Sequence, residues 1–106
     1  MGSTVETLLA ELRSGLEALY RGRLGGVYLY GSYARGEAER ESDLDVLIVL
    51  DRLDSYGAEI DRTSELVSRV SLTYGISVSR VFVTQEEWRK AGGFFLANAR
   101  EESIPA

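Results

Sequence analysis

The segment "DLDVLIVL", residues 43–50, decides the architecture of this chain. Its second part, Val46 to Leu50, is a continuous apolar run, which is typical of a central β-strand covered on both faces. Asp43 and Asp45 stand at its start with only Leu44 between them. Because alternate residues of a strand point to the same face, the two carboxylates are expected to project together. Two acids at the mouth of a buried strand therefore need a physical explanation.

The elements on either side of this strand follow from hydrophobic periodicity and from turn residues. Helices are expected over 3–19, 55–74, 85–90 and 94–103, strands over 27–30 and 76–83, and a helical turn with a loop over 32–42. Thr84 is expected to cap the third of these helices, with Glu87 three residues later. This order predicts an α/β (α+β) domain, a small mixed β-sheet of three or more strands with helices packed against it.

Length and composition limit the possible functions. A chain of 106 residues predicts one domain over residues 1–106. The net charge of -5, with no basic block, argues against extensive nucleic-acid binding by this chain alone. No apolar stretch approaches the roughly 20 residues that a membrane helix needs, so a cytoplasmic protein is expected. Histidine and cysteine are both absent, which excludes Ser-His and Cys-His catalysis and leaves oxygen ligands for any metal, as Mg2+ or Mn2+ prefers.

Two carboxylates held close together in partial burial repel each other and lose hydration. Protonation of one acid, pairing with arginines, or binding of divalent cations would each relieve the repulsion. The third solution fits best with Gly31-Ser32, which follows the strand over 27–30, because a glycine lets the backbone approach an anion closely. The alternative is ordinary turn chemistry on a solvated edge, since both motifs are common singly. Taken jointly, they predict a nucleoside triphosphate site.

The joint pattern is a strand, Gly31-Ser32, ten residues, Asp43-Leu44-Asp45 and a buried strand. It resembles the signature of the nucleotidyltransferase superfamily that includes DNA polymerase beta, and in particular its minimal nucleotidyltransferase (MNT) family. The resemblance covers most of the chain and implies the nucleotidyltransferase fold.

The resemblance also implies roles for particular residues. Asp43 and Asp45 would be the catalytic metal ligands, holding Mg2+ (Mn2+ is possible) on ATP or another nucleoside triphosphate. Gly31 and Ser32 would hold the terminal phosphates. Arg35, one helical turn beyond Ser32, would reach the same anion, or would instead pair on the surface with Glu37 or Glu39.

One part of the family pattern is not found in the sequence. The family usually supplies a third carboxylate from the next strand, as metal ligand and as base for the attacking hydroxyl. In residues 76–83 the layout places Ser79, or else Ser77, at that position, and serine is not a useful base at neutral pH. Glu86 and Glu87 are interpreted as acids in the first turn of a helix. A missing general base costs about 10²–10⁴-fold in rate, so nucleotide binding is better supported than turnover.

Two main functions follow from the resemblance. The first is transfer of a nucleoside monophosphate, with AMP expected, from the triphosphate to a hydroxyl, with a HEPN-type helical protein as the expected acceptor. The second is an antitoxin or binding module of a toxin-antitoxin system, which neutralises a HEPN ribonuclease toxin by complex formation with little or no catalysis. A degenerate domain with a residual acid pair is a third possibility.

Overall fold

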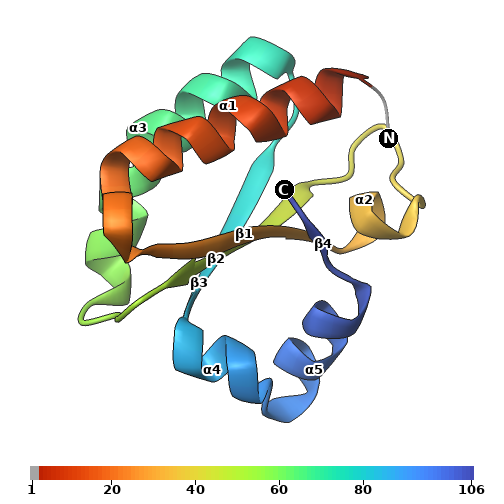
Figure 1. Cartoon of the computed structure of the whole chain (residues 1–106). Helices are drawn as coiled ribbons and strands as arrows, with labels where there is room; N and C mark the ends of the chain where they lie inside the picture. The colour runs from red at the N-terminus through yellow and green to blue at the C-terminus, as the bar shows by residue number, and fades with distance from the viewer. Residues whose placement is uncertain (1–2) are drawn as a thin grey trace.

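The computed structural model describes residues 3–106, with side chains from residue 4 onward. Its elements are α1 (Ser3–Tyr20), the 3₁₀ helix η1 (Arg21–Arg23), β1 (Leu24–Tyr30), α2 (Ser32–Arg35), β2 (Leu44–Leu50), α3 (Tyr56–Tyr74), β3 (Val78–Thr84), α4 (Gln85–Lys90), α5 (Gly93–Glu102) and β4 (Ile104–Pro105) (Figure 1). This mixed arrangement of helices on a small sheet confirms the fold class predicted from the sequence. Within residues 3–106, no helix combines the length and apolar character needed to cross a membrane.

The four strands form one mixed sheet in the order β3-β2-β1-β4. β1 pairs antiparallel with both β2 and β4, whereas β2 and β3 are parallel. The interior place of β2 confirms the prediction of a central strand. Its register sets Asp45 opposite Tyr30 of β1 and beside Ser79 of β3. The first residues of β2 therefore lie between the end of one strand and the beginning of another.

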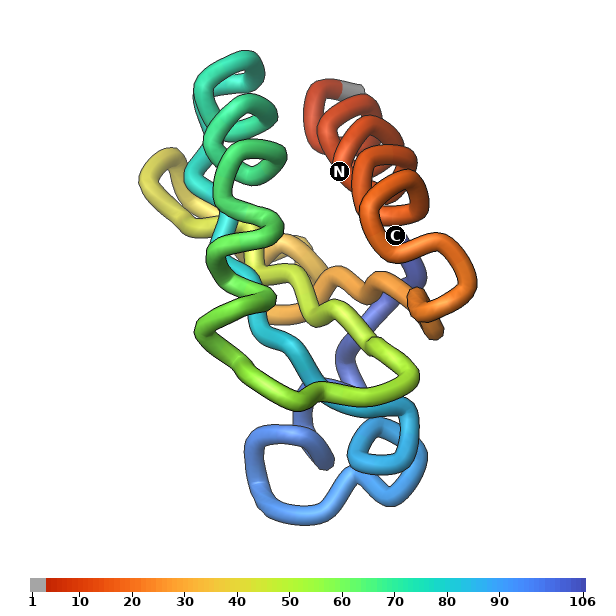
Figure 2. The backbone as a smooth tube through the Cα atoms, turned by 90° about the vertical axis from the view of Figure 1, so that its left-hand side faces the viewer, coloured from red at the N-terminus to blue at the C-terminus, as the bar shows by residue number. Residues whose placement is uncertain are grey.

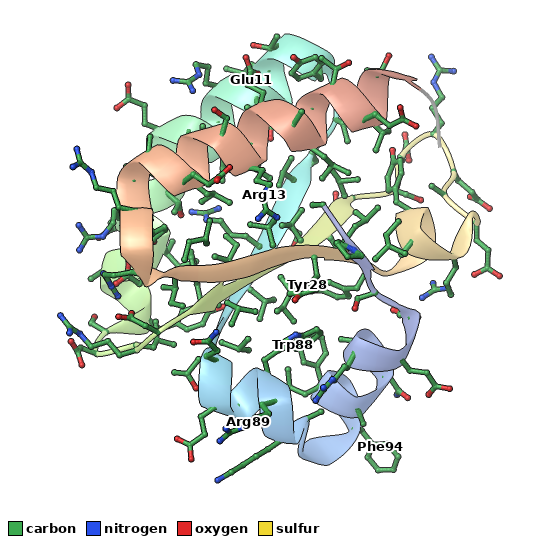
Figure 3. The ribbon with its side chains drawn as sticks, in the orientation of Figure 1. Glu11, Arg13, Tyr28, Trp88, Arg89 and Phe94 are labelled. Atoms are coloured by element: carbon green, nitrogen blue, oxygen red, sulfur yellow. The ribbon has the colours of Figure 1, made fainter. Side chains whose placement is uncertain are left out.

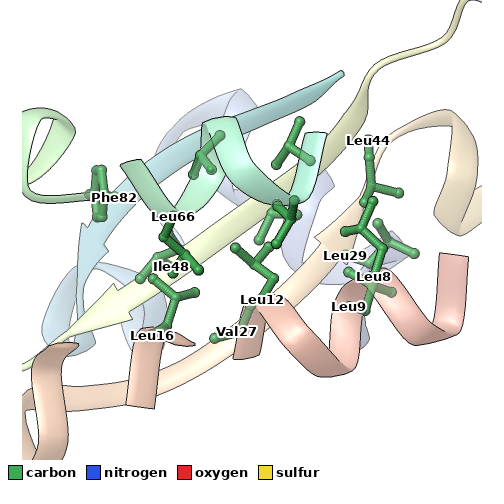
Figure 4. Close-up of a cluster of buried hydrophobic side chains, with 14 of the residues drawn as sticks. Leu8, Leu9, Leu12, Leu16, Val27, Leu29, Leu44, Ile48, Leu66 and Phe82 are labelled. Atoms are coloured by element: carbon green, nitrogen blue, oxygen red, sulfur yellow. The ribbon is translucent and has the colours of Figure 1, made fainter. Parts of the chain in front are cut away.

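Helices α1 and α3 cover one face of the sheet, and α4 and α5 lie on the other (Figures 1 and 2). The face under α1 and α3 holds the main core, in which leucines of α1 contact alternate residues of β1 and β2 (Figure 4). Its buried members are Val5, Leu8, Leu9, Leu12, Leu16, Tyr20, Val27, Leu29, Leu44, Val46, Ile48, Leu50, Leu66, Val67, Val70, Val78 and Phe82. The apolar stripe of α1, spaced at three and four residues, explains why this helix packs here.

The opposite face has a smaller core. Its buried members are Leu47, Val49, Val83 and Ala99. The rings of Tyr28 and Trp88 extend this cluster, with centroids 4.9 Å apart between the sheet and α4 (Figure 3). Phe94 of α5 points away from it and is 89% exposed. This face is therefore thinner and less completely covered.

The strand over 76–83 is observed as Val78–Thr84, and the largest differences from the predicted strands concern β1 and β4. β1 begins at Leu24 rather than at residue 27, and its register is irregular between Leu24 and Gly26. Glycines carry little strand signal, so pairing with β2 rather than local preference extends the strand. β4 was not expected at all, because two residues that pair with Tyr28 and Leu29 leave no periodic pattern. By contrast, Thr84 and Glu87 form the predicted capping box of α4.

Candidate functional site

A pocket of about 390 Å3 lies where β1 ends, β2 begins, and α2 and α5 approach them. It is lined by Tyr30, Gly31, Ser32, Arg35, Asp45, Phe95, Asn98, Ala99 and Glu102. Four of the five residues predicted for the site share this pocket, namely Gly31, Ser32, Arg35 and Asp45. The fifth, Asp43, is not part of the lining and is exposed immediately before β2.

The backbone at Gly31 is shaped for a close approach. Gly31 has φ 77° and ψ -157°, a conformation that is almost restricted to glycine. A Cβ atom at this position would lie 2.2 Å from Oδ2 of Asp45, so a side chain cannot be accommodated without displacing the carboxylate. Gly31 and Asp45, which belong to the two motifs found in the sequence, thus pack directly against each other in the structure.

The two aspartates influence each other without any neutralising contact. Burial raises the pKa of Asp45 above its usual range, and the negative charge of Asp43 raises it further, while Arg35 partly opposes them. Within residues 3–106, neither carboxylate forms a hydrogen bond or an ion pair with a protein group. Within the described residues, the repulsion between Asp43 and Asp45 is therefore not relieved by pairing with an arginine.

Glu102, the last residue of α5, was missed by the sequence analysis. Its Oε1 accepts a hydrogen bond from the backbone N–H of Gly31 at 2.9 Å, and its Oε2 pairs with Nη1 of Arg35 at 3.0 Å. The Gly31 N–H lowers the pKa of the Glu102 carboxyl, and Arg35 lowers it further. Residues 31 and 102 are far apart in the chain, and no local motif could have signalled this contact.

Arg35 forms two ion pairs, and one of them is the predicted surface pairing. Its Nε donates to Oε1 of Glu37 at 2.6 Å, which is the surface pairing considered from the sequence. Its Nη1 reaches Glu102 inside the pocket lining. Arg35 thus lies at the rim of the pocket, with Nε directed to Glu37 on the surface and Nη1 directed to Glu102 of the pocket lining.

An aromatic wall closes the side of the pocket next to β1. Tyr30 and Phe95 meet edge to face, with ring centroids 5.6 Å apart. Burial raises the pKa of Tyr30 to about 12, and the charge of Asp45 adds to this effect. Tyr30 is therefore a neutral phenol at physiological pH and can donate a hydrogen bond but cannot act as a base.

The neighbouring strand places a hydroxyl rather than an acid beside Asp45. Ser79 is its register partner in β3, as the layout of the sequence predicted. Glu86 and Glu87 lie in the first turn of α4, where Glu87 returns to the N–H of Thr84 at 2.9 Å. Within the described residues, no group of three or more His, Cys, Asp or Glu is arranged to hold a metal ion. Two unpaired carboxylates still fit a hard divalent cation if substrate oxygens complete its coordination.

Comparison with known proteins supplies a family context for this geometry. Residues 9–102 match the family profile described as "Nucleotidyltransferase domain". A protein of Methanocaldococcus jannaschii named "Putative protein adenylyltransferase" is 34% identical over 98 residues, which cover 92% of each chain. These matches extend well beyond the Gly-Ser and Asp-Leu-Asp motifs.

Two solved structures are similar as well. One is described as "Structure of putative minimal nucleotidyltransferase"; it has a TM-score of 0.62 and 27% identity, and the match covers 95% of this chain and 94% of that one. The other is a toxin-antitoxin structure with AMP-PNP, with a TM-score of 0.62 and 19% identity, covering 89% and 68% of the two chains. At that identity the second likeness shows the fold alone.

Proposed function

This chain belongs to the nucleotidyltransferase domain family, and from that premise we propose that it binds a nucleoside triphosphate, with ATP expected, together with Mg2+ and transfers the nucleoside monophosphate to a hydroxyl acceptor. Its resemblance to minimal nucleotidyltransferases is confirmed by the family profile and by the structural match. The single observation that carries the proposal is the half-buried, unpaired carboxylate of Asp45 against the backbone of Gly31. An acid whose burial is left uncompensated is best explained by a cation that it binds in the working complex.

The proposed roles follow from the donor types. Asp45 and Asp43 would hold Mg2+, or Mn2+, which would neutralise charge on the triphosphate during transfer. The Gly31 N–H, the Ser32 hydroxyl and the Arg35 guanidinium would hold phosphate oxygens. Asp45 would be the more important ligand, because it lines the pocket and carries the raised pKa. Asp43 would complete the pair from the exposed side.

The acceptor is proposed to be a hydroxyl on another protein. Support comes from the M. jannaschii relative, which is named as a putative protein adenylyltransferase. A HEPN-type helical protein remains the expected partner from the family resemblance. Ser79 beside Asp45 offers no strong base, so the acceptor hydroxyl would have to be activated by the cation or by the partner itself.

The second candidate function is an antitoxin that acts by complex formation alone. The specific observation in its favour is the same Ser79, since loss of a general base reduces turnover by about 10²–10⁴-fold without removing phosphate binding. A slow or inactive transferase would still retain a folded surface for a partner. The two functions therefore differ in whether the partner becomes modified.

The test uses labelled ATP, Mg2+ and a HEPN-type helical partner, with wild type, Asp45→Asn and Asp61→Asn compared. Asp61 is an exposed acid of α3, the helix that covers the other face of the sheet, and serves as a matched control. We expect label on the partner, a loss of at least about 100-fold in Asp45→Asn, and no change in Asp61→Asn. A tight complex without label would favour the binding module. Labelling that persists in Asp45→Asn would refute the proposed role of the pocket.

A further inference from the structure

Two of the three proposed anion-binding donors of the pocket already contact a carboxylate of the protein itself. Glu102 uses both carboxylate oxygens, one on the Gly31 N–H and the other on the Arg35 guanidinium. A backbone N–H and a guanidinium are the donors with which proteins hold phosphate oxygens. The amide of Gly31 has a single N–H, so a carboxylate and a phosphate cannot both accept from it, whereas the Arg35 guanidinium has further N–H groups. The internal contact and an external phosphate are therefore mutually exclusive at the Gly31 N–H.

We propose that Glu102 is a built-in competitor of the substrate: in the free protein it closes the phosphate-binding donors, and an incoming triphosphate must displace it. The inference rests on the proposed function, because it assumes that the ligand of this pocket carries phosphate. It assigns to the end of α5 a regulatory role at the same site. Glu102 therefore acts only in the ligand-free protein and takes no part in the transfer itself.

The surroundings of Glu102 permit this displacement. Its side chain is 26% exposed, so it can leave toward solvent without crossing the core. The chain after it is held independently, since β4 pairs with β1 and the N–H of Ala106 donates to the carbonyl of Val27 at 2.9 Å. On the other side, α5 rests on the thinner core through the buried Ala99. A change of rotamer or a small shift at the end of α5 can therefore open the donors while β4 stays paired.

Electrostatics favour displacement over coexistence. Glu102 and Asp45 both line the pocket, so their two negative charges repel each other. A triphosphate would add further negative charge beside both acids. The apparent affinity for the ligand is then reduced by the fraction of molecules in which Glu102 has left its donors. If that fraction is about one tenth, removing the contact strengthens binding about tenfold.

The decisive variants separate contact from charge. Glu102→Asp keeps the negative charge but is one methylene too short to reach both donors from the same backbone position. Glu102→Gln removes the charge. Glu101→Asp and Glu101→Gln are matched controls, because Glu101 is exposed and forms no ion pair within the described residues. Each protein is titrated calorimetrically with Mg-ATP and, separately, with inorganic tripolyphosphate.

We expect Glu102→Asp and Glu102→Gln to bind both ligands about tenfold more tightly than wild type, with the Glu101 variants unchanged. If wild type binds and both Glu102 variants bind equally or more weakly, Glu102 does not compete with the ligand. The proposed function would be unaffected by that result. Tighter binding in Glu102→Gln alone would also overturn the proposed competition, since charge without contact would then explain the effect. Failure of every protein to bind either ligand would refute the proposed function and the competitor together.

A second measurement uses wild type and so does not depend on the folding of a variant. The carboxyl carbon of Glu102 and the amide of Gly31 can be followed by NMR during titration with tripolyphosphate. We expect the Glu102 signal to move to the position of a solvated glutamate as the Gly31 amide shifts. Binding that leaves the Glu102 signal in place would contradict displacement.

Discussion

The two faces of the sheet show opposite solutions to the burial of an acid. On the face under α1 and α3, Glu59 is 4% exposed and accepts hydrogen bonds from Tyr20 at 2.7 Å and from Arg62 at 3.0 Å. Burial alone would raise the pKa of Glu59, but these two donors lower it below its usual range. On the other face, Asp45 is half-buried with no such partner within the described chain, and its pKa is raised. A buried acid with hydrogen-bond donors, such as Glu59, stabilises the fold, whereas a partly buried acid without them, such as Asp45, indicates a candidate functional site.

The same contrast appears in the packing. The core under α1 and α3 is one large cluster of buried side chains (Figure 4), and it fixes the strands that carry the site residues. The core under α4 and α5 is small, and the pocket begins where it ends. One face therefore supplies rigidity and the other supplies room for a ligand, a division that permits precise placement of Asp45 beside a pocket.

The largest expected effect tests this division of packing. Leu16→Ala in α1 removes a fully buried side chain and is expected to lower the free energy of unfolding by about 2–5 kcal/mol. Leu96→Ala in α5 removes a partly buried side chain and is expected to lower it by about 1 kcal/mol. Urea denaturation of both variants provides the measurement. Equal losses would mean that the two faces contribute equally to stability.

A smaller effect is expected from the backbone of the site. Gly36→Ala places a side chain at φ 72° in open space and is expected to cost about 1–2 kcal/mol from strain alone. Gly31→Ala adds a collision with Asp45 to a less favourable backbone conformation, and about 2–3 kcal/mol is expected. Thermal unfolding compares the two variants directly. A smaller loss for Gly31→Ala would show that Asp45 is free to move away.

The sequence predicted which residues lie close together where local chemistry determines their position. The apolar run after Asp45 requires a central strand, and the period of that strand sets which residues share its face. Gly31 was identifiable because a strand ended there and a glycine permits close backbone approach. The family layout gave Ser79, or else Ser77, as the residue of the next strand nearest the acids, and the register pairs Ser79 with Asp45.

The sequence could not predict what tertiary packing brings together. Glu102 reaches Gly31 only because α5 folds back against the end of β1 and β4 then pairs with that strand. Neither step leaves a periodic or motif signal, and the two-residue β4 is too short for any pattern. An acid at the end of an ordinary helix looks like surface charge until its partner 71 positions away is known.

Neutralising the buried Glu59 and the half-buried Asp45 should have opposite consequences for stability. Glu59→Gln removes the charge that Tyr20 and Arg62 satisfy and is expected to destabilise the fold by about 1–3 kcal/mol. Asp45→Asn is expected to raise the melting temperature slightly in metal-free buffer. The reason is that a raised pKa in the folded state means that the ionised form is disfavoured there, and asparagine carries no charge. Calorimetry of both variants at pH 7 gives the sign of each change, and a stability loss in Asp45→Asn would indicate an internal partner for this acid.

The smallest effect concerns the contact between Glu102 and the pocket donors, and it depends on pH. The folded-state pKa of Glu102 is lowered, so the contact stabilises the fold above the unfolded-state pKa of about 4.3 and is lost as the pH falls through the lowered value. At pH 6 the free energy of unfolding of wild type is thus expected to exceed that of Glu102→Gln by about 0.2–1 kcal/mol. The difference is small because Glu102 and Arg35 are both partly exposed. Denaturation at successively lower pH below pH 6 should show this difference decline, with no such trend for Glu101→Gln. If the stability difference between wild type and Glu102→Gln instead grew as the pH fell, it would have the sign expected for Asp45, because protonation of Asp45 relieves its repulsion with Asp43. The pH dependence would then be assigned to the two aspartates and not to Glu102.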